Sequence, residues 1–409
     1  MQITKLNSLL RYYIWAPLAL TGPETVPEEN VLLEILNNRI VSRQTVAKDL
    51  LPDNVINHPR LICLDQGTTL MPSLIDSHIH LALDGSDFSR ARALSNNREI
   101  RQAGLEQKLL GTIQSGVGMV RDGGDFRSIN LEARELVESG QCPGPRIIAT
   151  GEAIREKGGY GSFLGGDYGS KEQLPEVVDR VWESGADQLK VVISGVVSFC
   201  QFGLVKGPVM SLGIAKHVVE CARKRRLKVM AHASSAGAVD VAVESGVDSV
   251  EHGYFVKTET LKIMAEKQIA WIPTIIPVAI QIREPLRELL TPLEIDVITR
   301  TFEEQIDKLE LADSFGVPLG IGTDSGAPGV LHGPNLVEEM LLYGKSSLDN
   351  RTIIKAATGG NAAILGLEKE VGILEPGFKA RLIAVRGNPL KELSALQEVV
   401  AHFMPSRSL

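Results

Sequence analysis

The sequence predicts an α/β protein in which a parallel (β/α)8 barrel is joined to a small β-sandwich domain built from both ends of the chain. Eight short apolar or β-branched runs follow one another through the middle of the chain, and helical patterns separate most of them. The two ends instead contain mainly strand-like patterns. We therefore expect residues 1–70 and 369–409 to form the small domain and residues 71–368 to form the barrel.

The predicted strands of the small domain come from both ends of the chain. The apolar segment Leu9–Leu20 is too short to span a bilayer and contains Arg11 and Pro17, so a buried strand is favoured over a signal peptide. The further short strands are expected at Val31–Ile35, Ile40–Val41, Arg60–Leu64, Arg381–Val385 and Val399–Phe403.

The middle of the chain supplies the predicted barrel. Its strands are expected at Leu70–Ile75, Val117–Val120, Ile147–Thr150, Gln188–Ile193, Lys228–Ala231, Ser249–His252, Ala270–Ile275 and Pro318–Ile321. Helical patterns between them include Leu131–Ser139, Leu174–Ser184, Ile214–Arg225, Ala236–Ser245 and Thr258–Lys267. Gly185 and Gly246 follow two of these helices, at the position where a C-terminal cap favours glycine. An open doubly wound sheet is the alternative, but no GxGxxG segment opens the first helix.

The composition is that of a soluble globular protein, with 44% hydrophobic and 23% charged residues among 409. The net charge is −7, and the only basic cluster, Arg223–Arg226, is typical of a solvated helix end, so nucleic-acid binding is not expected. Four scattered cysteines without a CxxC pair favour reduced thiols in the cytoplasm. We expect no membrane partner, and the composition leaves a homo-oligomer open.

Histidines and an aspartate stand at the predicted carboxyl ends of several strands, where barrel enzymes place their active residues. His78 and His80 end the first strand, and residues two apart on a strand point to the same side, so both can ligate one metal ion. His232 ends the fifth strand, His252 ends the sixth, and Asp324 follows the eighth. Four of the eight histidines thus occupy strand ends, a pattern that unrelated core or surface histidines do not explain.

Lys190 lies inside the apolar run of the predicted fourth strand. Burial in a barrel core disfavours its ammonium form. A neutral amine can react with carbon dioxide to give a carbamate, whose anionic oxygens can bridge two cations. An ion pair with a carboxylate such as Asp324 is the alternative, but the company of the histidines favours the carboxylated lysine.

The motifs that contain these residues resemble the amidohydrolase superfamily. In chain order they are Met71–His80, Gly185–Lys190, Ala231–Ala233, Glu251–Gly253 and Gly322–Gly326, joined by Gly116–Gly124, Ala356–Thr358 and the turn Gly372–Gly377. The resemblance extends from about Val31 to the C-terminus. It is strongest to the branch of Xaa-Pro dipeptidase-like and imidazolonepropionase-related metal-dependent hydrolases.

This resemblance implies a centre with two divalent cations, usually zinc in such proteins. His78, His80 and Asp324 are expected to bind one cation, His232 and His252 the other, and N6-carboxylated Lys190 to bridge them. Such a centre activates water for attack on a small-molecule substrate, while Asp324 passes the proton to the departing nitrogen. The predicted reaction is hydrolysis of an amide or peptide-like bond, with a dipeptide or an N-acyl amino acid as substrate candidates.

Further residues near the predicted strand ends are candidates for the pocket. Tyr254 is a candidate for holding the oxyanion or a substrate carboxylate, and a core tyrosine is the alternative. His332 is a candidate for lining the pocket, while Asp76 is expected to have a supporting role. For Arg121 and Asp122, an internal salt bridge and a substrate-facing role remain open.

Three departures from the family pattern bear on packing and specificity. Ser73 stands where glycine is usual, and Arg381 stands where aspartate is usual. The stretch Val196–Cys200 replaces the glycine-rich loop of the dipeptidase-like members, and this weakens the transfer of a peptide substrate.

Two other functions compete with the binuclear hydrolase. A mononuclear cyclic amide hydrolase or deaminase of the imidazolonepropionase type typically has a glutamate three residues after the fifth-strand histidine and lacks the fourth-strand lysine. This chain has Ser235 at that position and keeps Lys190. A non-catalytic metal-binding homologue is the second alternative, but such proteins usually lack a ligand that is present here.

Overall fold

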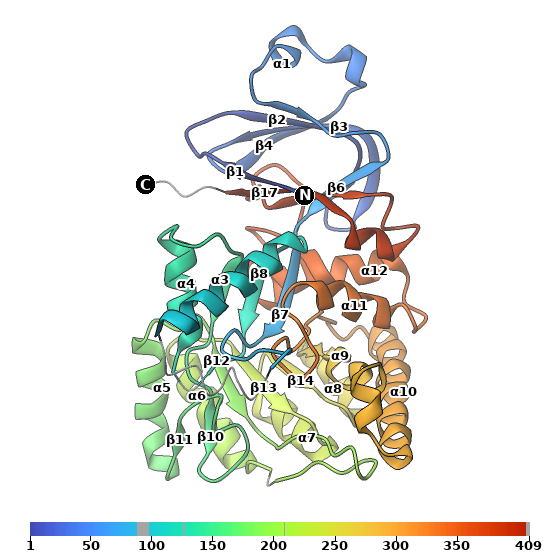
Figure 1. Ribbon diagram of the computed structural model, residues 1–409. Helices are drawn as coiled ribbons and strands as arrows, with labels where there is room; N and C mark the ends of the chain where they lie inside the picture. Colours follow the sequence, from blue (N-terminus) through green and yellow to red (C-terminus); the bar gives the residue numbers. More distant parts are fainter. Residues whose placement is uncertain (88–97, 126, 208, 406–409) are drawn as a thin grey trace.

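The structure is a computed structural model that describes residues 1–87, 98–125, 127–207 and 209–405 (Figure 1). A β-rich part that contains both ends of the described chain lies above a larger α/β part in this view (Figure 1). Among the described helices, none is both long enough and apolar enough to cross a membrane.

The β-rich part is one sheet whose strands come from both ends of the chain. They are β1 (Gln2–Leu6), β2 (Tyr12–Thr21), β3 (Val26–Leu36), β4 (Arg39–Thr45), β5 (Leu61–Cys63), β6 (Thr68–Pro72), β16 (Leu382–Arg386) and β17 (Val399–Pro405). Their order is β1-β17-β16-β6-β2-β3-β4, and β5 pairs with β2. The predicted buried strand near Leu20 is therefore present as β2. The strand pairings described here form one connected sheet, whereas we expected a β-sandwich.

One apolar cluster of this sheet contains residues from both ends of the chain. Leu33 and Ile35 of β3, Leu382 of β16 and Phe403 of β17 are buried in the same apolar cluster. Strands from the two ends therefore share one apolar core on this side of the sheet. In Figure 1 this sheet lies above the α/β part, and the arrow of β7 points away from it. The functional site lies at that far end of the strand.

The α/β part contains parallel strands arranged in two sheets. They are β7 (Leu74–Ile79), β8 (Val117–Asp122), β9 (Arg146–Ala149), β10 (Ile154–Glu156), β11 (Asp167–Tyr168), β12 (Leu189–Val192), β13 (Val229–Ala233), β14 (Ser249–His252) and β15 (Ala270–Ile272). One sheet has the order β7-β8-β9 and the other β11-β10-β12-β13-β14-β15. The seven strands predicted first thus overlap with observed strands, while β10 and β11 are additional.

The predicted eighth strand, Pro318–Ile321, is not a continuous strand among the described residues. Leu319 forms an isolated bridge with Trp271 of β15, and Ser325 forms one with Ile79 of β7. Pro318 lacks a backbone donor, which weakens a regular ladder at this point. A Cβ atom at Gly322 would lie 2.8 Å from the Cβ atom of His78, so only glycine permits this close approach.

The side chain of Asn361 completes the hydrogen bonding at this junction. Its amide nitrogen donates to the carbonyl oxygens of Ile75 and Ile321 at 2.6 and 2.8 Å, and its carbonyl oxygen accepts from the Ile321 N–H at 3.1 Å. The segment 318–325 is therefore held between β15 and β7. This position brings Asp324 next to the end of β7.

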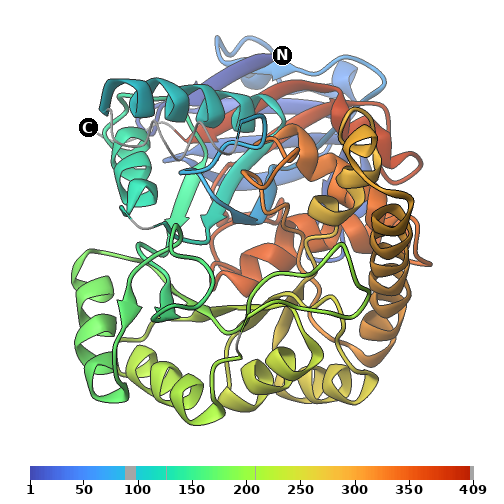
Figure 2. The same cartoon turned by 60° about the horizontal axis from the view of Figure 1, so that its bottom comes forward.

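Helices surround the α/β strands on the outside (Figure 2). They are α3 (Arg98–Gln114), α4 (Ile129–Glu138), α5 (Leu174–Glu183), α6 (Leu212–Lys224), α7 (Ala236–Ser245), α8 (Thr258–Lys267), α9 (Ile276–Ala279), α10 (Pro292–Phe315), α11 (Pro334–Tyr343), α12 (Asn350–Lys355) and α13 (Asn361–Ile364), and α1 (Asp53–Ile56) belongs to the β-rich part. Gly246 ends α7 with a φ of 80°, which is the left-handed cap predicted from the sequence.

Candidate metal centre

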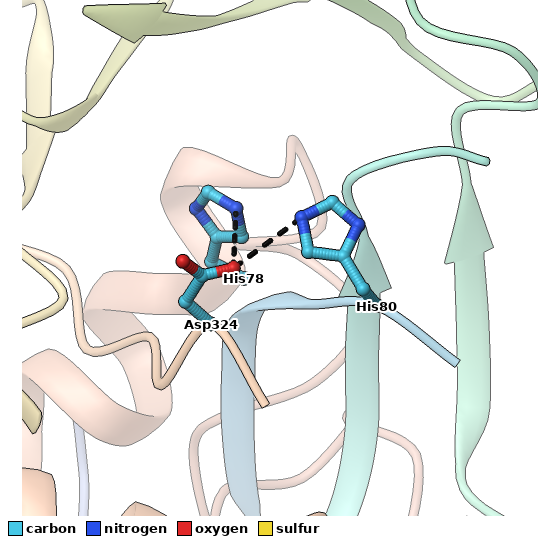
Figure 3. Close-up of side chains that lie close together, drawn as sticks. All are labelled: His78, His80 and Asp324. Carbon is cyan, nitrogen blue, oxygen red and sulfur yellow. Dashed lines mark ion pairs between the residues drawn. The ribbon is translucent and has the colours of Figure 1, made fainter. Parts of the chain in front are cut away.

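His78, His80 and Asp324 meet at the carboxyl end of β7 (Figure 3). The Nε2 atoms of His78 and His80 lie 3.6 and 3.3 Å from Oδ1 of Asp324. One ligand atom from each residue lies within 4.8 Å of the other two. Two imidazoles and a carboxylate at this spacing are suited to a divalent cation such as zinc.

The remaining predicted ligands adjoin this group. The ring of His252 lies 5.1 Å from that of His78 and 4.5 Å from that of His232, measured between centroids. Nζ of Lys190 lies 3.4 Å from Nε2 of His78. The structure therefore brings together four histidines, a lysine and an aspartate. They come from β7, β12, β13 and β14, or the residue next to them, and from the segment 318–325.

One nitrogen of each histidine is held by a polar group of the protein. Nδ1 of His80 lies 3.0 Å from the carbonyl oxygen of Gly124, Nε2 of His232 lies 3.0 Å from that of Gly195, and Nδ1 of His252 lies 2.7 Å from Oγ1 of Thr274. Each of these nitrogens can donate, because the carbonyl oxygens only accept and the Thr274 hydroxyl itself donates to Pro273 at 2.8 Å. The other nitrogen of each ring is thereby left with a lone pair for a cation.

His78 is oriented by a buried ion pair that the sequence alone did not reveal. Its Nδ1 atom lies 2.8 Å from Oε2 of Glu251, and Oε1 of Glu251 accepts from Arg121 Nη2 at 3.0 Å. Arg121 also donates to the Ser77 carbonyl oxygen at 2.6 Å, and Ser249 donates to Glu251 at 2.6 Å. Arg121 therefore forms an internal salt bridge, which resolves the alternative left open for it.

Burial makes these side chains suitable as ligands. It lowers the pKa of His78 well below its usual range and the pKa values of His80 and His232 to about 3 and 4, and the Lys190 charge acts in the same direction. The imidazoles are therefore neutral, as metal binding requires. Burial also lowers the pKa of Lys190 and raises that of Asp324. It thus favours the neutral amine of Lys190.

The backbone is strained at three positions of the centre. His252, Thr274 and Asp324 have φ values of 69°, 47° and 55°, in the left-handed region that side chains other than glycine rarely adopt. Such conformations cost about 1–3 kcal/mol each and persist where the surroundings impose them. Here they aim the His252 ring at the Thr274 hydroxyl and direct Asp324 toward β7.

A cavity of about 250 Å³ opens beside the centre, and His80, His232, His252 and Asp324 line it. Tyr254 is buried in its wall, and its ring stacks on that of His252 with 5.8 Å between centroids. Tyr160 also lines the cavity, 5.4 Å from the His232 ring. Tyr160 could not be predicted from a sequence pattern, because it stands in an irregular loop between β10 and β11.

The other predicted residues have supporting positions. His332 is not among the described residues that line the cavity, contrary to our expectation, and its Nε2 donates to the carbonyl oxygen of His80 at 3.1 Å. Asp76 accepts from the Thr323 backbone and hydroxyl at 3.0 and 2.7 Å and thus holds the residue before Asp324. Asp122 accepts from the Leu81 N–H at 2.7 Å, which fixes the chain after His80.

We expect Glu251→Gln to weaken zinc binding about 10–100-fold, because the neutral amide no longer orients and polarises the His78 imidazole as a carboxylate does. The measurement is a competition titration with a chromophoric chelator. Glu370→Gln is the matched control, since Glu370 forms a surface ion pair with Lys379 and Arg146, and it should bind zinc as the parent protein does. Equal affinity in both variants would show that Glu251 does not control the His78 ligand.

Comparison with known proteins identifies the family. The profile of the amidohydrolase family matches residues 69–405. The chain is 25% identical over 363 residues to ochratoxinase of Aspergillus niger, covering 80% of this chain and 72% of that protein, and 22% identical over 393 residues to imidazolonepropionase of Alkaliphilus metalliredigens, covering 87% and 83%. A crystal structure of a Xaa-Pro dipeptidase with bound methionine superposes with a TM-score of 0.83 at 26% identity, covering 95% of this chain and 97% of that one. These findings confirm the resemblance inferred from the motifs: the chain belongs to the amidohydrolase family and is a hydrolase that acts on carbon–nitrogen bonds.

Proposed function

We propose that this chain is a binuclear metal-dependent amidohydrolase that cleaves an amide bond of a small molecule. The observation that carries the proposal is the convergence of His78, His80, His232, His252, Lys190 and Asp324 beside one cavity. We infer that the surrounding α/β part is a (β/α)8 barrel closed through the segment 318–325.

The donor atoms fit two divalent cations, and imidazole with carboxylate ligands favours zinc. His78, His80 and Asp324 would hold one cation, and His232 and His252 would hold the other. Lys190 would bridge them as a carbamate, since a bare ammonium 3.4 Å from a histidine ligand would oppose cation binding. Bound cations of this kind lower the pKa of water and polarise a carbonyl group.

The protein's own groups perform the proton transfer and position the substrate. Asp324 would accept the proton of the attacking water and deliver it to the amide nitrogen, because an amine leaves only when protonated. Tyr254 and Tyr160 flank His252 and His232 and would donate hydrogen bonds to the developing oxyanion. His332 would act indirectly, by holding the backbone of His80.

The mononuclear cyclic amide hydrolase is the second candidate, and the similarity to an imidazolonepropionase favours it. The position of Lys190 favours the binuclear centre instead. Its amine lies beside His78, and although the charges of Glu251 and Asp324 favour the ammonium form, the described carboxylates form no direct ion pair with it. A structural lysine buried in this way would require such a partner.

We expect a chelator to abolish amide hydrolysis and added zinc to restore it, with recovery complete at about two equivalents per chain. Amine release from a panel of dipeptides, N-acyl amino acids, lactams and neutral amides measures activity, and elemental analysis measures bound zinc. Full recovery at one equivalent would support the mononuclear candidate. Undiminished activity of the metal-free protein would contradict both.

A further inference from the structure

The walls of the cavity beside the metal centre are mostly apolar. Tyr160, Phe163 and Leu164 belong to one apolar cluster, and Phe163 packs edge-on against Tyr160 with 5.7 Å between ring centroids. Tyr254, Val278, Val197 and Phe199 belong to a second cluster. Each cluster reaches the centre through its tyrosine, one beside His232 and the other beside His252. The cavity thus offers apolar surface next to both of these histidines.

The described side chains that line the cavity include an acidic group but no lysine or arginine. Asp324 is the only acidic residue among the described residues that line it, and neither lysine nor arginine lines it in that part of the chain. The buried Arg121 is bound to Glu251 and to the Ser77 carbonyl oxygen, outside the lining. As far as the described lining residues go, a substrate carboxylate away from the metals would therefore be desolvated near Asp324 without a cationic side chain to compensate.

The polar groups of the cavity suit a neutral ligand. Tyr160 and Tyr254 both line the cavity, and a tyrosine hydroxyl can donate a hydrogen bond to a neutral carbonyl group. The carboxamide nitrogen of Gln281 is already bound to the carbonyl oxygens of Pro277 and Pro328, at 3.1 and 3.0 Å. The volume of about 250 Å³ lies below the range of about 300–1,000 Å³ that is usual for drug-sized ligands, so it suits a substrate with one ring.

We propose that the substrate is a neutral amide whose acyl and amine substituents are both uncharged and apolar, one of them carrying an aromatic ring. This inference rests on the proposed hydrolysis and narrows it, since it disfavours the dipeptides and N-acyl amino acids considered from the sequence. Water would add to the carbonyl carbon, the carbon–nitrogen bond would break, and the nitrogen would take up a proton. The products would be a carboxylic acid and an apolar amine.

Matched substrates that differ only by a carboxylate test the proposal. N-acetylphenethylamine is compared with N-acetylphenylalanine, and N-methylbenzamide with N-benzoylglycine, so that the charge is probed with the ring on either side of the amide. For the zinc-loaded protein we expect kcat/KM to be at least about tenfold higher for the neutral member of each pair, because an uncompensated buried charge weakens binding. A preference for the carboxylates would overturn the proposal while leaving amide hydrolysis intact.

Binding of analogues that cannot be hydrolysed tests the proposed substrate class separately from the proposed hydrolysis. Ketones in which a methylene group replaces the amide nitrogen of the first pair cannot be hydrolysed, and calorimetry gives their affinities. The neutral ketone should bind at least about tenfold more tightly. Equal affinities would overturn the substrate class. No turnover of any amide, together with tighter binding of the neutral ketone, would overturn the proposed hydrolysis and still support the apolar selectivity.

A variant that adds a cation provides an internal control. Gln281→Arg should shift the ratio of kcat/KM values toward the carboxylate substrates by roughly fivefold, as expected for an opposite charge about 4 Å away in water. Gln281→Met removes the same side-chain hydrogen bonds without adding charge, and it should keep the parent ratio. An unchanged ratio in Gln281→Arg would contradict the view that the lack of a cation among the described lining residues sets the selectivity.

Discussion

Asp324→Asn is expected to lower kcat by about 10³-fold while the protein remains folded. Asparagine has the same shape as aspartate, but its amide cannot take a proton from water and pass it to the leaving nitrogen. Asn also tolerates the left-handed backbone, which at this position has a φ of 55°. The measurements are steady-state kinetics, zinc content and thermal unfolding, and at least one equivalent of zinc should remain bound.

The matched control is Asp296→Asn, because Asp296 is an exposed residue of α10 that pairs only with Arg300 in the described ion pairs. This control should keep the parent kcat. Turnover close to that of the parent in Asp324→Asn would remove Asp324 from the proton-transfer role. Loss of all zinc would instead assign it a purely ligating role.

Local sequence patterns were sufficient to place His78 and His80 together. Both stand on one short strand, and the period of two alone puts them on one side. The positions of His232 and His252 followed from the order of parallel strands, since consecutive β13 and β14 are hydrogen-bonded neighbours. These inferences needed only strand order and direction, which apolar periodicity predicts well.

Contacts between side chains from distant parts of the chain could not be predicted where no motif marks the residues. Arg121 of β8 and Glu251 of β14 are opposite charges inside apolar strands, and that is the one signal that could have suggested their pairing. The loop that carries Tyr160 has no periodicity, so its path depends on tertiary packing. The apolar run Pro318–Ile321 predicts a strand, but Pro318 has no backbone donor, and the Asn361 side chain accepts from the Ile321 N–H and donates to its carbonyl oxygen.

His332 shows a different limit of sequence reasoning. A histidine after the eighth predicted strand is expected near the cavity, and His332 is indeed buried close to His80. Its ring nevertheless points at a backbone carbonyl oxygen, and burial lowers its pKa to about 3. A residue's place after a predicted strand therefore predicts that it lies near the cavity, while the surrounding loop decides where its side chain points.

Lys190→Ala is expected to lower kcat by at least about 10³-fold, because the variant loses the anionic group that would bridge the two cations. Truncation also removes a fully buried side chain and leaves space beside His78. Acetate or propionate can enter that space and supply carboxylate oxygens, so activity should recover in part as the acid concentration rises. Kinetics at constant ionic strength, with chloride in place of the acid, measure this recovery.

The variant Lys190→Met distinguishes rescue of activity by acid bound in the vacated space from a general effect of salt or acid on the enzyme. Methionine fills most of the volume of the lysine side chain with apolar atoms, so the variant should be as inactive as Lys190→Ala but should not respond to acetate. Rescue of both variants to the same degree would place the acid elsewhere. Parent-like activity of Lys190→Ala without any acid would exclude the bridging role, and the centre would then have to work with the histidines and Asp324 alone.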